Sequence, residues 1–263
     1  MKAITSDLPA HDVVDGWTRR IEICALLAAG ALLLANINHI VATGLCWHWW
    51  SPLVLIAAAL AADLVSGLVH WTADTWFSET MPFLGRRFLR PFRVHHVNPD
   101  DFLRRDAVDC NGDVAMLNVP ILLVALLLPE AGPSGAVSLA LTAFATISLP
   151  TNQVHQWAHM PSPPSFVRWL QRRGIILSVE AHASHHREPY IANYCIATGW
   201  CNRSLNAAGF FPTCERLITH VTGLQPRADE QAEPVGRADH DAELEHGQRQ
   251  KAAERVACDR DRG

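Results

Sequence analysis

The sequence lacks the patterns that hold most redox centres. Its seven cysteines form no CxxC pair and no regular spacing, so they give no support for a disulfide framework, a zinc ribbon or an iron–sulfur cluster. No GxGxxG motif for a nucleotide cofactor and no haem motif occurs. If the chain carries out redox chemistry, its electrons must therefore come from outside.

Net charge and tyrosine are also scarce. The formal net charge is −4 and the mean hydropathy is only +0.06, which superficially describes a soluble protein. That average misleads, because the apolar residues are gathered into blocks. The chain has nine tryptophans against two tyrosines, and tryptophan favours the boundary between lipid and water. The composition therefore favours a membrane protein.

Four apolar blocks are predicted to span a membrane, a task that takes about 20 residues of helix. They cover roughly 21–45, 52–71, 114–128 and 134–150, and a helical continuation follows the fourth at Thr151. Lysine and arginine are absent from the connection between the first two spans and from the turn between the last two. Because arginines cluster on the other connections, the positive-inside rule places those connections in the cytoplasm. We expect an all-α membrane protein of about four transmembrane helices with a histidine-rich helical domain at the cytoplasmic face.

The chain is expected to divide into three parts. A polar N-terminal segment (1–20) precedes a membrane domain (21–225), and a charged tail (226–263) has too few large apolar residues to build a core. Within the membrane domain, residues 163–177 are amphipathic and rich in arginine. They are predicted to lie among lipid headgroups, with an ordinary surface helix as the alternative. Asp63 interrupts the second span. Its carboxylate is either functional or forms a hydrogen bond between two helices.

Eight histidines from four separate stretches fall on the predicted cytoplasmic side. They are His70, His95, His96, His155, His159, His182, His185 and His186. Residues three or four apart share one face of a helix, which lets His155 and His159 bind one metal together. Adjacent histidines point about 100° apart on a helix, so each adjacent pair suits two metals rather than one. The set predicts two metal ions with about four imidazoles each.

The identity of the metal stays open on these residues alone, because nitrogen-rich sites without thiolate suit iron, zinc or copper. A zinc hydrolase is disfavoured, since Gln156 stands where an HExxH motif needs glutamate. Haem would be expected on single histidines facing each other inside the spans, and surface histidines without metal are the remaining alternative. Asp74, four residues after His70, could bind the metal or hydrogen-bond a bound histidine. Asn152 and Asp113 are candidates for the same role.

Several motifs together resemble the CarF/Kua lipid desaturase family over roughly residues 20–229. They are His70-Trp-Thr-Ala-Asp74-Thr-Trp76, Arg90-Pro-Phe-Arg-Val-His-His96, Asn111-Gly-Asp113, Asn152-Gln-Val-His-Gln-Trp-Ala-His159, His182-Ala-Ser-His-His186 and Asn193-Tyr-Cys-Ile-Ala-Thr-Gly-Trp-Cys-Asn202. That family includes the plasmanylethanolamine desaturases and has plant acyl-lipid desaturases as relatives. One departure is Arg105, where family members often carry histidine, and it puts the neighbouring Asp106 in doubt as a site residue.

The resemblance implies an enzyme whose eight histidines bind two iron ions. O₂ would be its co-substrate, a membrane phospholipid its substrate, and cytochrome b5 or a ferredoxin-like protein its external electron donor. The favoured reaction converts the sn-1 alkyl ether of an ethanolamine phospholipid to the vinyl ether of a plasmalogen. A fatty acyl-lipid desaturase or hydroxylase of the same di-iron chemistry is the nearest alternative, and a non-enzymatic membrane metal or haem protein is the second.

Arginines near the histidines are candidates for binding the substrate phosphate. These are Arg90, Arg93 and Arg187, each of which could equally serve only as a topology signal. Neither a nucleic-acid partner nor a particular oligomeric state is predicted.

Overall fold

The computed structural model describes residues 14–78, 80–81, 85–130, 132–187 and 190–226, and within these it contains helices and no strand. The chain divides into two units, Met1–Gln225 and Pro226–Gly263, and the helices described below belong to the first. The predicted tail (226–263) lies outside the described residues except for Pro226, and the N-terminal segment (1–20) is described only from Val14.

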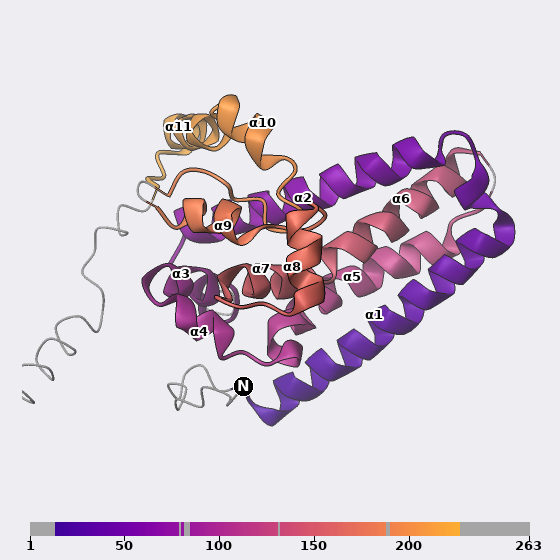
Figure 1. The fold of residues 1–263 in the computed structure, drawn as a ribbon, viewed down its shortest axis with the longest axis horizontal. Helices are drawn as coiled ribbons and strands as arrows, with labels where there is room; N and C mark the ends of the chain where they lie inside the picture. Colours follow the sequence, from indigo (N-terminus) through magenta and orange to yellow (C-terminus); the bar gives the residue numbers. More distant parts are fainter. Residues whose placement is uncertain (1–13, 79, 82–84, 131, 188–189, 227–263) are drawn as a thin grey trace, which may run out of the picture. The chain divides into compact units, whose positions relative to one another are not determined.

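Four apolar helices, each long enough to cross a membrane, confirm the predicted fold class. They are α1 (Gly16–Thr43), α2 (Ser51–Thr75), α5 (Ala107–Leu127) and α6 (Pro133–Ser148), the last continued by α7 (Thr151–His159). Helix α1 packs along α5, α2 along α6, and α5 along α6 (Figure 1). The protein is therefore a multi-pass membrane protein.

Helices α1 and α5 begin several residues before their apolar blocks, at positions where aspartate side chains cap their first turns. The Asp15 carboxylate accepts hydrogen bonds from the backbone N–H groups of Trp17 and Thr18 at the start of α1. Asp106 caps α5 in the same way at 2.9 Å, so this span starts at Ala107 and not near residue 114. The polar motif that includes Asp113 consequently lies on the first turns of a membrane helix.

The bundle is packed through small residues, with large apolar side chains outside. Its central cluster contains Ala25, Ala29, Ala115 and Ala145 around Leu122, and alanines let membrane helices approach closely. The buried Asn36 side chain donates to the Leu122 carbonyl at 2.9 Å and so ties α1 to α5. Leucines exposed on the outer surface, such as Leu34 and Leu117, would face lipid.

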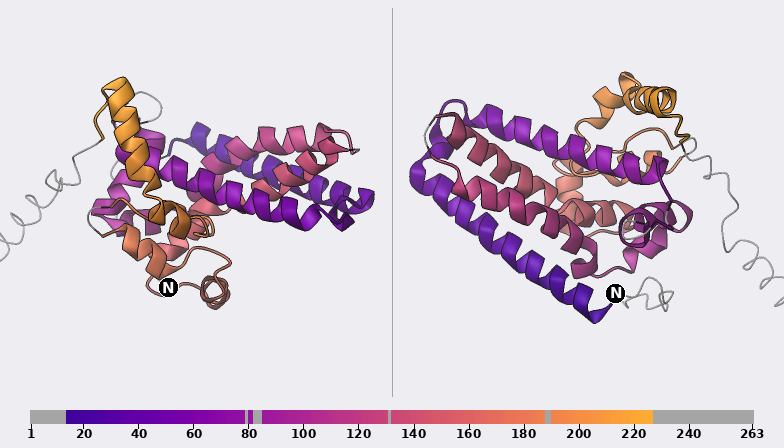
Figure 2. Two further views of the ribbon diagram at one scale, coloured as in Figure 1. Left: turned by 90° about the horizontal axis from the view of Figure 1, so that it is seen from above. Right: turned by 180° about the vertical axis from the view of Figure 1, so that it is seen from behind.

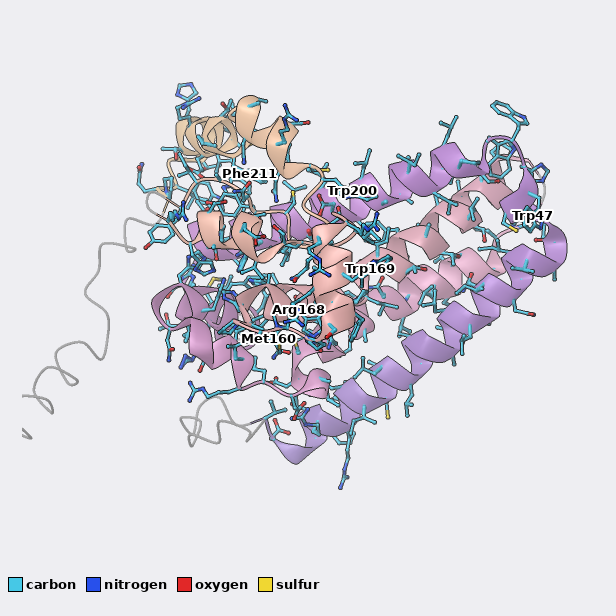
Figure 3. The ribbon with its side chains drawn as sticks, in the orientation of Figure 1. Trp47, Met160, Arg168, Trp169, Trp200 and Phe211 are labelled. Atoms are coloured by element: carbon cyan, nitrogen blue, oxygen red, sulfur yellow. The ribbon has the colours of Figure 1, made fainter. Side chains whose placement is uncertain are left out.

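The remaining helices gather where α2 ends and α5 begins, an end of the bundle that we call the histidine end (Figures 1 and 2). They are η3 (Gly85–Leu89), α3 (Arg90–Val97), α4 (Pro99–Leu103), α8 (Ser165–Arg172), α9 (Val179–His185), α10 (Asn202–Ala207) and α11 (Phe210–Thr222). The opposite end carries the short helix η2 (Leu45–Trp47) and the exposed Trp47 (Figure 3).

Asp63 turns out to anchor a loop. Its buried carboxylate accepts hydrogen bonds from the backbone N–H groups of Thr198, Gly199 and Cys201 at 2.7–2.9 Å. Three charge-assisted bonds compensate the cost of burying this carboxylate in a membrane helix. Its partners therefore differ from the predicted helix–helix hydrogen bond, because they are backbone groups of a loop.

Helix α8 lies within the predicted amphipathic segment 163–177. Its buried face carries Val167 and Gln171, whereas Phe166 and Trp169 are exposed together with the neighbouring arginines. The exposed Trp200, labelled beside Trp169 in Figure 3, donates its indole N–H to the Gly174 carbonyl at 2.6 Å. The position of this segment among lipid headgroups stays a prediction.

Candidate metal centre

All eight predicted histidines meet at the histidine end. Helix α2 contributes His70, α3 contributes the adjacent pair at 95 and 96, and α7 contributes the pair at 155 and 159. Helix α9 contributes His182 and His185, and His186 caps its C-terminus. The side chains form two groups whose ligand atoms lie within 4.8 Å of one another in each group.

The first group contains five histidines. They are His95, His155, His159, His182 and His186. The Nε2 atom of His182 lies 2.9 Å from that of His155, 2.7 Å from that of His159 and 3.1 Å from that of His186. The four nitrogens therefore converge on a common point from α7 and α9.

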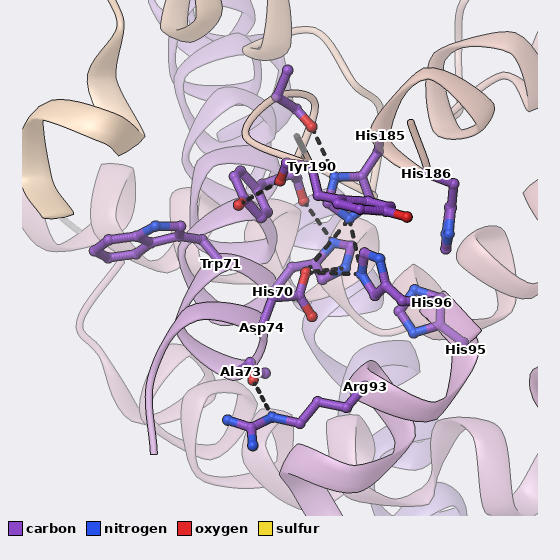
Figure 4. Close-up of polar contacts among 12 residues, drawn as sticks. His70, Trp71, Ala73, Asp74, Arg93, His95, His96, His185, His186 and Tyr190 are labelled. Atoms are coloured by element: carbon purple, nitrogen blue, oxygen red, sulfur yellow. Dashed lines mark hydrogen bonds and ion pairs between the residues drawn. The ribbon is translucent and has the colours of Figure 1, made fainter. Parts of the chain in front are cut away.

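The second group contains three histidines and a carboxylate. Oδ2 of Asp74 lies 3.1 Å from Nε2 of both His70 and His96, and 3.5 Å from that of His185 (Figure 4). The His185 and His96 Nε2 atoms are 3.3 Å apart. Asp74 thus completes a group of four side chains that could hold a metal ion, in keeping with one of its two predicted roles.

Each adjacent histidine pair divides between the groups. His95 belongs to the first group and His96 to the second, and His186 and His185 divide in the same way. The groups are neighbours, since the ring centroids of His70 and His155, one from each, are 5.2 Å apart. The arrangement suits two metal ions side by side. It differs from the expected four imidazoles each, because five histidines lie in one group and three with Asp74 in the other.

The spacing of the imidazole nitrogens suits coordination of metal ions better than hydrogen bonding among the nitrogens themselves. Nitrogens bound at about 2.1 Å to one ion lie about 3.0–3.4 Å apart in octahedral or tetrahedral sites, close to the spacings found here. A neutral imidazole Nε2 carries one proton or one lone pair, so His182 cannot hydrogen-bond three other nitrogens at once. The buried Nε2 atom of His95 has no hydrogen-bond partner among the described residues, and that of His70 has the Asp74 carboxylate at 3.1 Å as its neighbour. Buried polar atoms left in this state are rare without a ligand.

Backbone carbonyls orient three of these imidazoles. The Nδ1–H of His70 donates to the Tyr194 carbonyl at 3.1 Å, that of His185 to the Ala192 carbonyl at 2.8 Å, and that of His95 to the Pro91 carbonyl at 3.2 Å. A carbonyl can only accept, so the proton of each ring is held on Nδ1. Nε2 is then left with its lone pair toward the group.

The loop that supplies two of those carbonyls is itself held in place by side chains. Asn202 pairs with the backbone of Cys195 through two hydrogen bonds of 2.9 Å. Asn193 pairs with Asn206, and the Ser66 hydroxyl accepts the Ile196 N–H at 3.0 Å. The sequence did not predict the role of this loop in orienting histidines. Its only signal there was the motif between Asn193 and Asn202.

Burial and neighbouring imidazoles keep the histidines outside the spans neutral. Desolvation and the nearby His70 lower the pKa of His185 to about 4, and desolvation with His96 lowers that of His186 to about 2. Burial likewise lowers the pKa of His95 and His182 well below its ordinary value. Neutral imidazoles are the form that binds metal, so the site is prepared for metal at neutral pH.

Arg93, one of the three arginines predicted to bind phosphate, is buried at the end of α2. Its buried guanidinium donates to the carbonyls of Ala73, Trp76 and Phe77 at 2.5–3.0 Å, at the end of α2. Figure 4 shows the bond to Ala73. Carbonyls left over at a helix C-terminus need such donors. Arg93 therefore stabilises the end of α2, and its Nε and Nη2 groups already donate there. The phosphate contact of Arg93 stays a prediction. Arg90 is half-buried, and Arg187 is exposed directly after His186.

Two further candidates lie beside the histidine groups without joining them. Asn152 donates to the Cys110 carbonyl at 2.9 Å, and both Asn152 and Asp113 line a cavity that reaches His155. Asp106 lies away from both groups and forms an ion pair of 2.8 Å with Arg19. The doubt about Asp106 as a site residue thus agrees with its place as a helix cap.

Comparison with known proteins identifies relatives. The model of the lipid desaturase domain matches residues 59–229, a range that includes all eight histidines. Plasmanylethanolamine desaturase of Myxococcus xanthus is 42% identical over 221 residues, which cover 84% of this chain and 79% of that protein. Plasmanylethanolamine desaturase 1 of Mus musculus is 37% identical over 222 residues, 80% of either chain. The chloroplastic fatty acid desaturase 4 of Arabidopsis thaliana is 31% identical over 218 residues, 81% of this chain and 65% of that protein. No solved structure matches the chain.

Proposed function

Because this chain belongs to the lipid desaturase family, we propose that it acts as a plasmanylethanolamine desaturase. It would convert the sn-1 alkyl ether of an ethanolamine phospholipid to a vinyl ether. The observation that carries the proposal is the pair of adjacent histidine groups at one end of four apolar helices. A membrane lipid can reach such a site from the bilayer without passing through water.

Iron is the metal that we propose for both groups. The residues that would hold it are the five histidines of the first group and His70, Asp74, His96 and His185 of the second. Two bound irons would supply an O₂-dependent oxidation in which one hydrogen leaves C1 and one leaves C2 of the alkyl chain. Those hydrogens, two external electrons and two protons balance the reduction of O₂ to two waters.

The protein's own contribution is placement and exclusion of water. The carbonyls of Tyr194, Ala192 and Pro91 hold the imidazole rings so that their Nε2 atoms face the two groups. The carboxylate of Asp74 adds negative charge to the second group, which offsets part of the charge of a cation. His70, His155 and His185 are at most 1% exposed, so water is kept from the reacting centre.

The electrons would come from a separate protein, for which we propose cytochrome b5 or a ferredoxin-like donor. None of the cysteines among the described residues belongs to either histidine group, and the sequence offers no motif for a bound redox cofactor. The arginine-rich connections and the positive-inside rule favour a cytoplasmic position for the histidine end, where such donors are found.

A fatty acyl-lipid desaturase is the second candidate. It is favoured by the similarity to the plant fatty acid desaturase 4, although that identity is 31% against 42% for the Myxococcus xanthus relative. The two reactions use the same chemistry and differ in how far the reacting bond lies from the headgroup. The metal ligands alone do not distinguish them.

Expression in a host that makes no plasmalogen tests the proposal. Cells supplied with an alkyl ether lipid precursor should accumulate ethanolamine phospholipids with an acid-labile vinyl ether, measured by mass spectrometry before and after acid treatment. The variant His185→Ala should make none. New double bonds in ester-linked acyl chains, without vinyl ether, would favour the acyl-lipid desaturase.

A further inference from the structure

A cavity of about 100 Å³ adjoins the first histidine group at His155. It lies between α2, η3, α3, α4, α5 and α7. One part of its wall is polar and contains Arg105, Asp109, Asp113 and Asn152, and the rest is apolar and includes Val114 and Leu117. The metal ligands account for only one residue of this wall, so the cavity is a separate feature of the histidine end.

The polar part of the wall carries charge of both signs. Asp109 and Asp113, four residues apart, lie on one face of the first turns of α5, and Arg105 directly precedes Asp106, the residue that caps this helix. The Nη1 atom of Arg105 lies 3.3 Å from the Asp109 carboxylate, longer than a typical charge-assisted hydrogen bond of about 2.7–2.9 Å. The buried Nε of Arg105 has no hydrogen-bond partner among the described residues. The Nη2 atom of Arg105 lies 4.0 Å from the Asp101 carboxylate, beyond hydrogen-bond distance, so Arg105 retains donors for a ligand.

Gln156 fixes this wall to the helix that carries the metal ligands. Its side-chain N–H groups donate to the carbonyls of Phe102 at 2.8 Å and Arg105 at 2.9 Å. Gln156 directly follows His155 on α7, so the backbone that carries Arg105 is held at a set distance from the first histidine group. Asn152 makes a matching bond from α7 to the Cys110 carbonyl on α5.

The proposed reaction requires polar groups close to the metals. The bond that would become the vinyl ether lies directly beside the ether oxygen, only a few bonds from the phosphate of the same lipid. A headgroup site must therefore adjoin the histidine groups and not lie a chain length away. Charged side chains around a partly buried cavity are costly unless groups of complementary charge pair with them, and the two charges of a zwitterionic headgroup would add such pairs.

We propose that this cavity binds the phosphoethanolamine headgroup of the substrate, an inference that rests on the proposed function. Arg105 binds the phosphate, and Asp113 accepts hydrogen bonds from the primary ammonium. Asp109 holds Arg105 in place. The alkyl chain leaves along the apolar wall by Leu117, whose side chain is 67% exposed on the outer surface of α5. A trimethylammonium has no N–H to donate, so Asp113 would select ethanolamine over choline.

Lipid binding and turnover by three variants of the purified full chain test this assignment. Alkyl ether phospholipids with ethanolamine or choline headgroups are offered in nanodiscs, and lipid retained by the protein is also counted by native mass spectrometry. The wild type should bind and turn over the ethanolamine lipid in preference to the choline lipid by about 10-fold or more. Asp113→Asn should reduce that preference to about 3-fold or less, because an amide no longer attracts the ammonium. Arg105→Gln should weaken the binding of both lipids about 10-fold and keep the preference for ethanolamine, because both lipids carry the phosphate.

Arg104→Gln is the matched control, because it removes the same charge at the neighbouring position. The Arg104 side chain pairs with Asp101 and does not line the cavity. It should behave as the wild type. If Arg105→Gln does not fold, Arg105→Lys serves instead and should retain part of the affinity. Soluble phosphoethanolamine should bind at least about 100-fold more weakly than the lipid, and equal binding would indicate a site for soluble phosphoesters and overturn the proposal.

Two outcomes separate this inference from the proposed function. An Asp113→Asn variant with the wild-type preference, or an Arg105→Gln variant with wild-type binding, overturns the headgroup site even if vinyl ethers form. Conversely, the headgroup site is supported if the two variants change retained lipid as expected while no vinyl ether forms from any lipid. In that case the proposed reaction alone fails.

Discussion

His95 and His96 are adjacent in the chain, yet their imidazoles belong to different histidine groups. Their ring centroids are 4.5 Å apart. The ring of His95 packs edge-on against that of His155 in the first group, whereas Nε2 of His96 lies 3.1 Å from the Asp74 carboxylate in the second. One turn of α3 thus joins the two groups, and a change at either residue should affect one group before the other.

Replacing these histidines singly should remove the metals singly. His95→Ala is expected to lower the metal content of the first group and His96→Ala that of the second. Each purified variant should keep about one metal per chain and lose activity at least about 100-fold, since even residues that merely support a ligand contribute 10–100-fold. Metal analysis and the lipid assay measure the two effects. His220→Ala, on the exposed side of α11, is the control and should keep both metals. Loss of both metals from both variants would argue against two separable groups.

The carboxylate of Asp74 should matter as charge as well as shape. Asp74→Asn keeps the size of the side chain and removes the negative charge within 3.1–3.5 Å of three imidazoles. We expect weaker metal binding by the second group and a loss of activity of about 100-fold or more. Competition with a chelator, followed by metal analysis, measures the affinity. Wild-type metal retention in Asp74→Asn would show that this carboxylate is no ligand.

The sequence predicted the set of eight histidines because their spacing and the topology of the spans are local properties. It also predicted that His95 and His96 would serve different metals, from the 100° turn between adjacent helical residues. The division into five histidines and three with Asp74 was not predictable, because it depends on how α7 and α9 approach α2 and α3. Contacts between helices that are far apart in the chain produce no recognisable spacing of residues in the sequence.

Side chains with two possible partners were the hardest to predict. Arg93 was predicted to bind phosphate, but its guanidinium lies against three carbonyls at the end of α2. Asp63 was correctly singled out as a carboxylate in a span, yet its partners are backbone N–H groups more than a hundred residues away. In both cases the residue type predicted a polar contact, but nothing in the sequence identified the partner.

Removing the Asp63 carboxylate should loosen the loop that orients His70 and His185. Asp63→Ala leaves three backbone N–H groups without their acceptor, and we expect a loss of about 2–4 kcal/mol in the free energy of unfolding. Ser66→Ala removes a neutral side chain of α2 that accepts a hydrogen bond from the same loop, and it should cost about 1 kcal/mol. Thermal unfolding in detergent measures both. Equal stability of the two variants would contradict the anchoring role.

The same carboxylate should control the reactivity of Cys201. Burial and the nearby Asp63 charge raise the pKa of the Cys201 thiol to about 11. The thiolate fraction therefore stays small below that pH and rises tenfold per pH unit up to it. At pH 8, alkylation by iodoacetamide should be at least about 10-fold slower than for an ordinary thiol, even allowing for the greater nucleophilicity of a high-pKa thiolate. Asp63→Asn should make the alkylation of Cys201 faster, because it removes the nearby negative charge. Peptide mass spectrometry at this cysteine measures the rate, and a pH-independent rate between pH 7 and 10 would contradict the shift.

The iron content of the purified protein tests the central claim most directly. Protein made in iron-supplemented cells should contain about two irons per chain, should show no Soret band, and should fall to about one iron per chain in His96→Ala. A single iron per chain in the fully loaded wild type, or a haem spectrum, would contradict an account built on two adjacent metal sites.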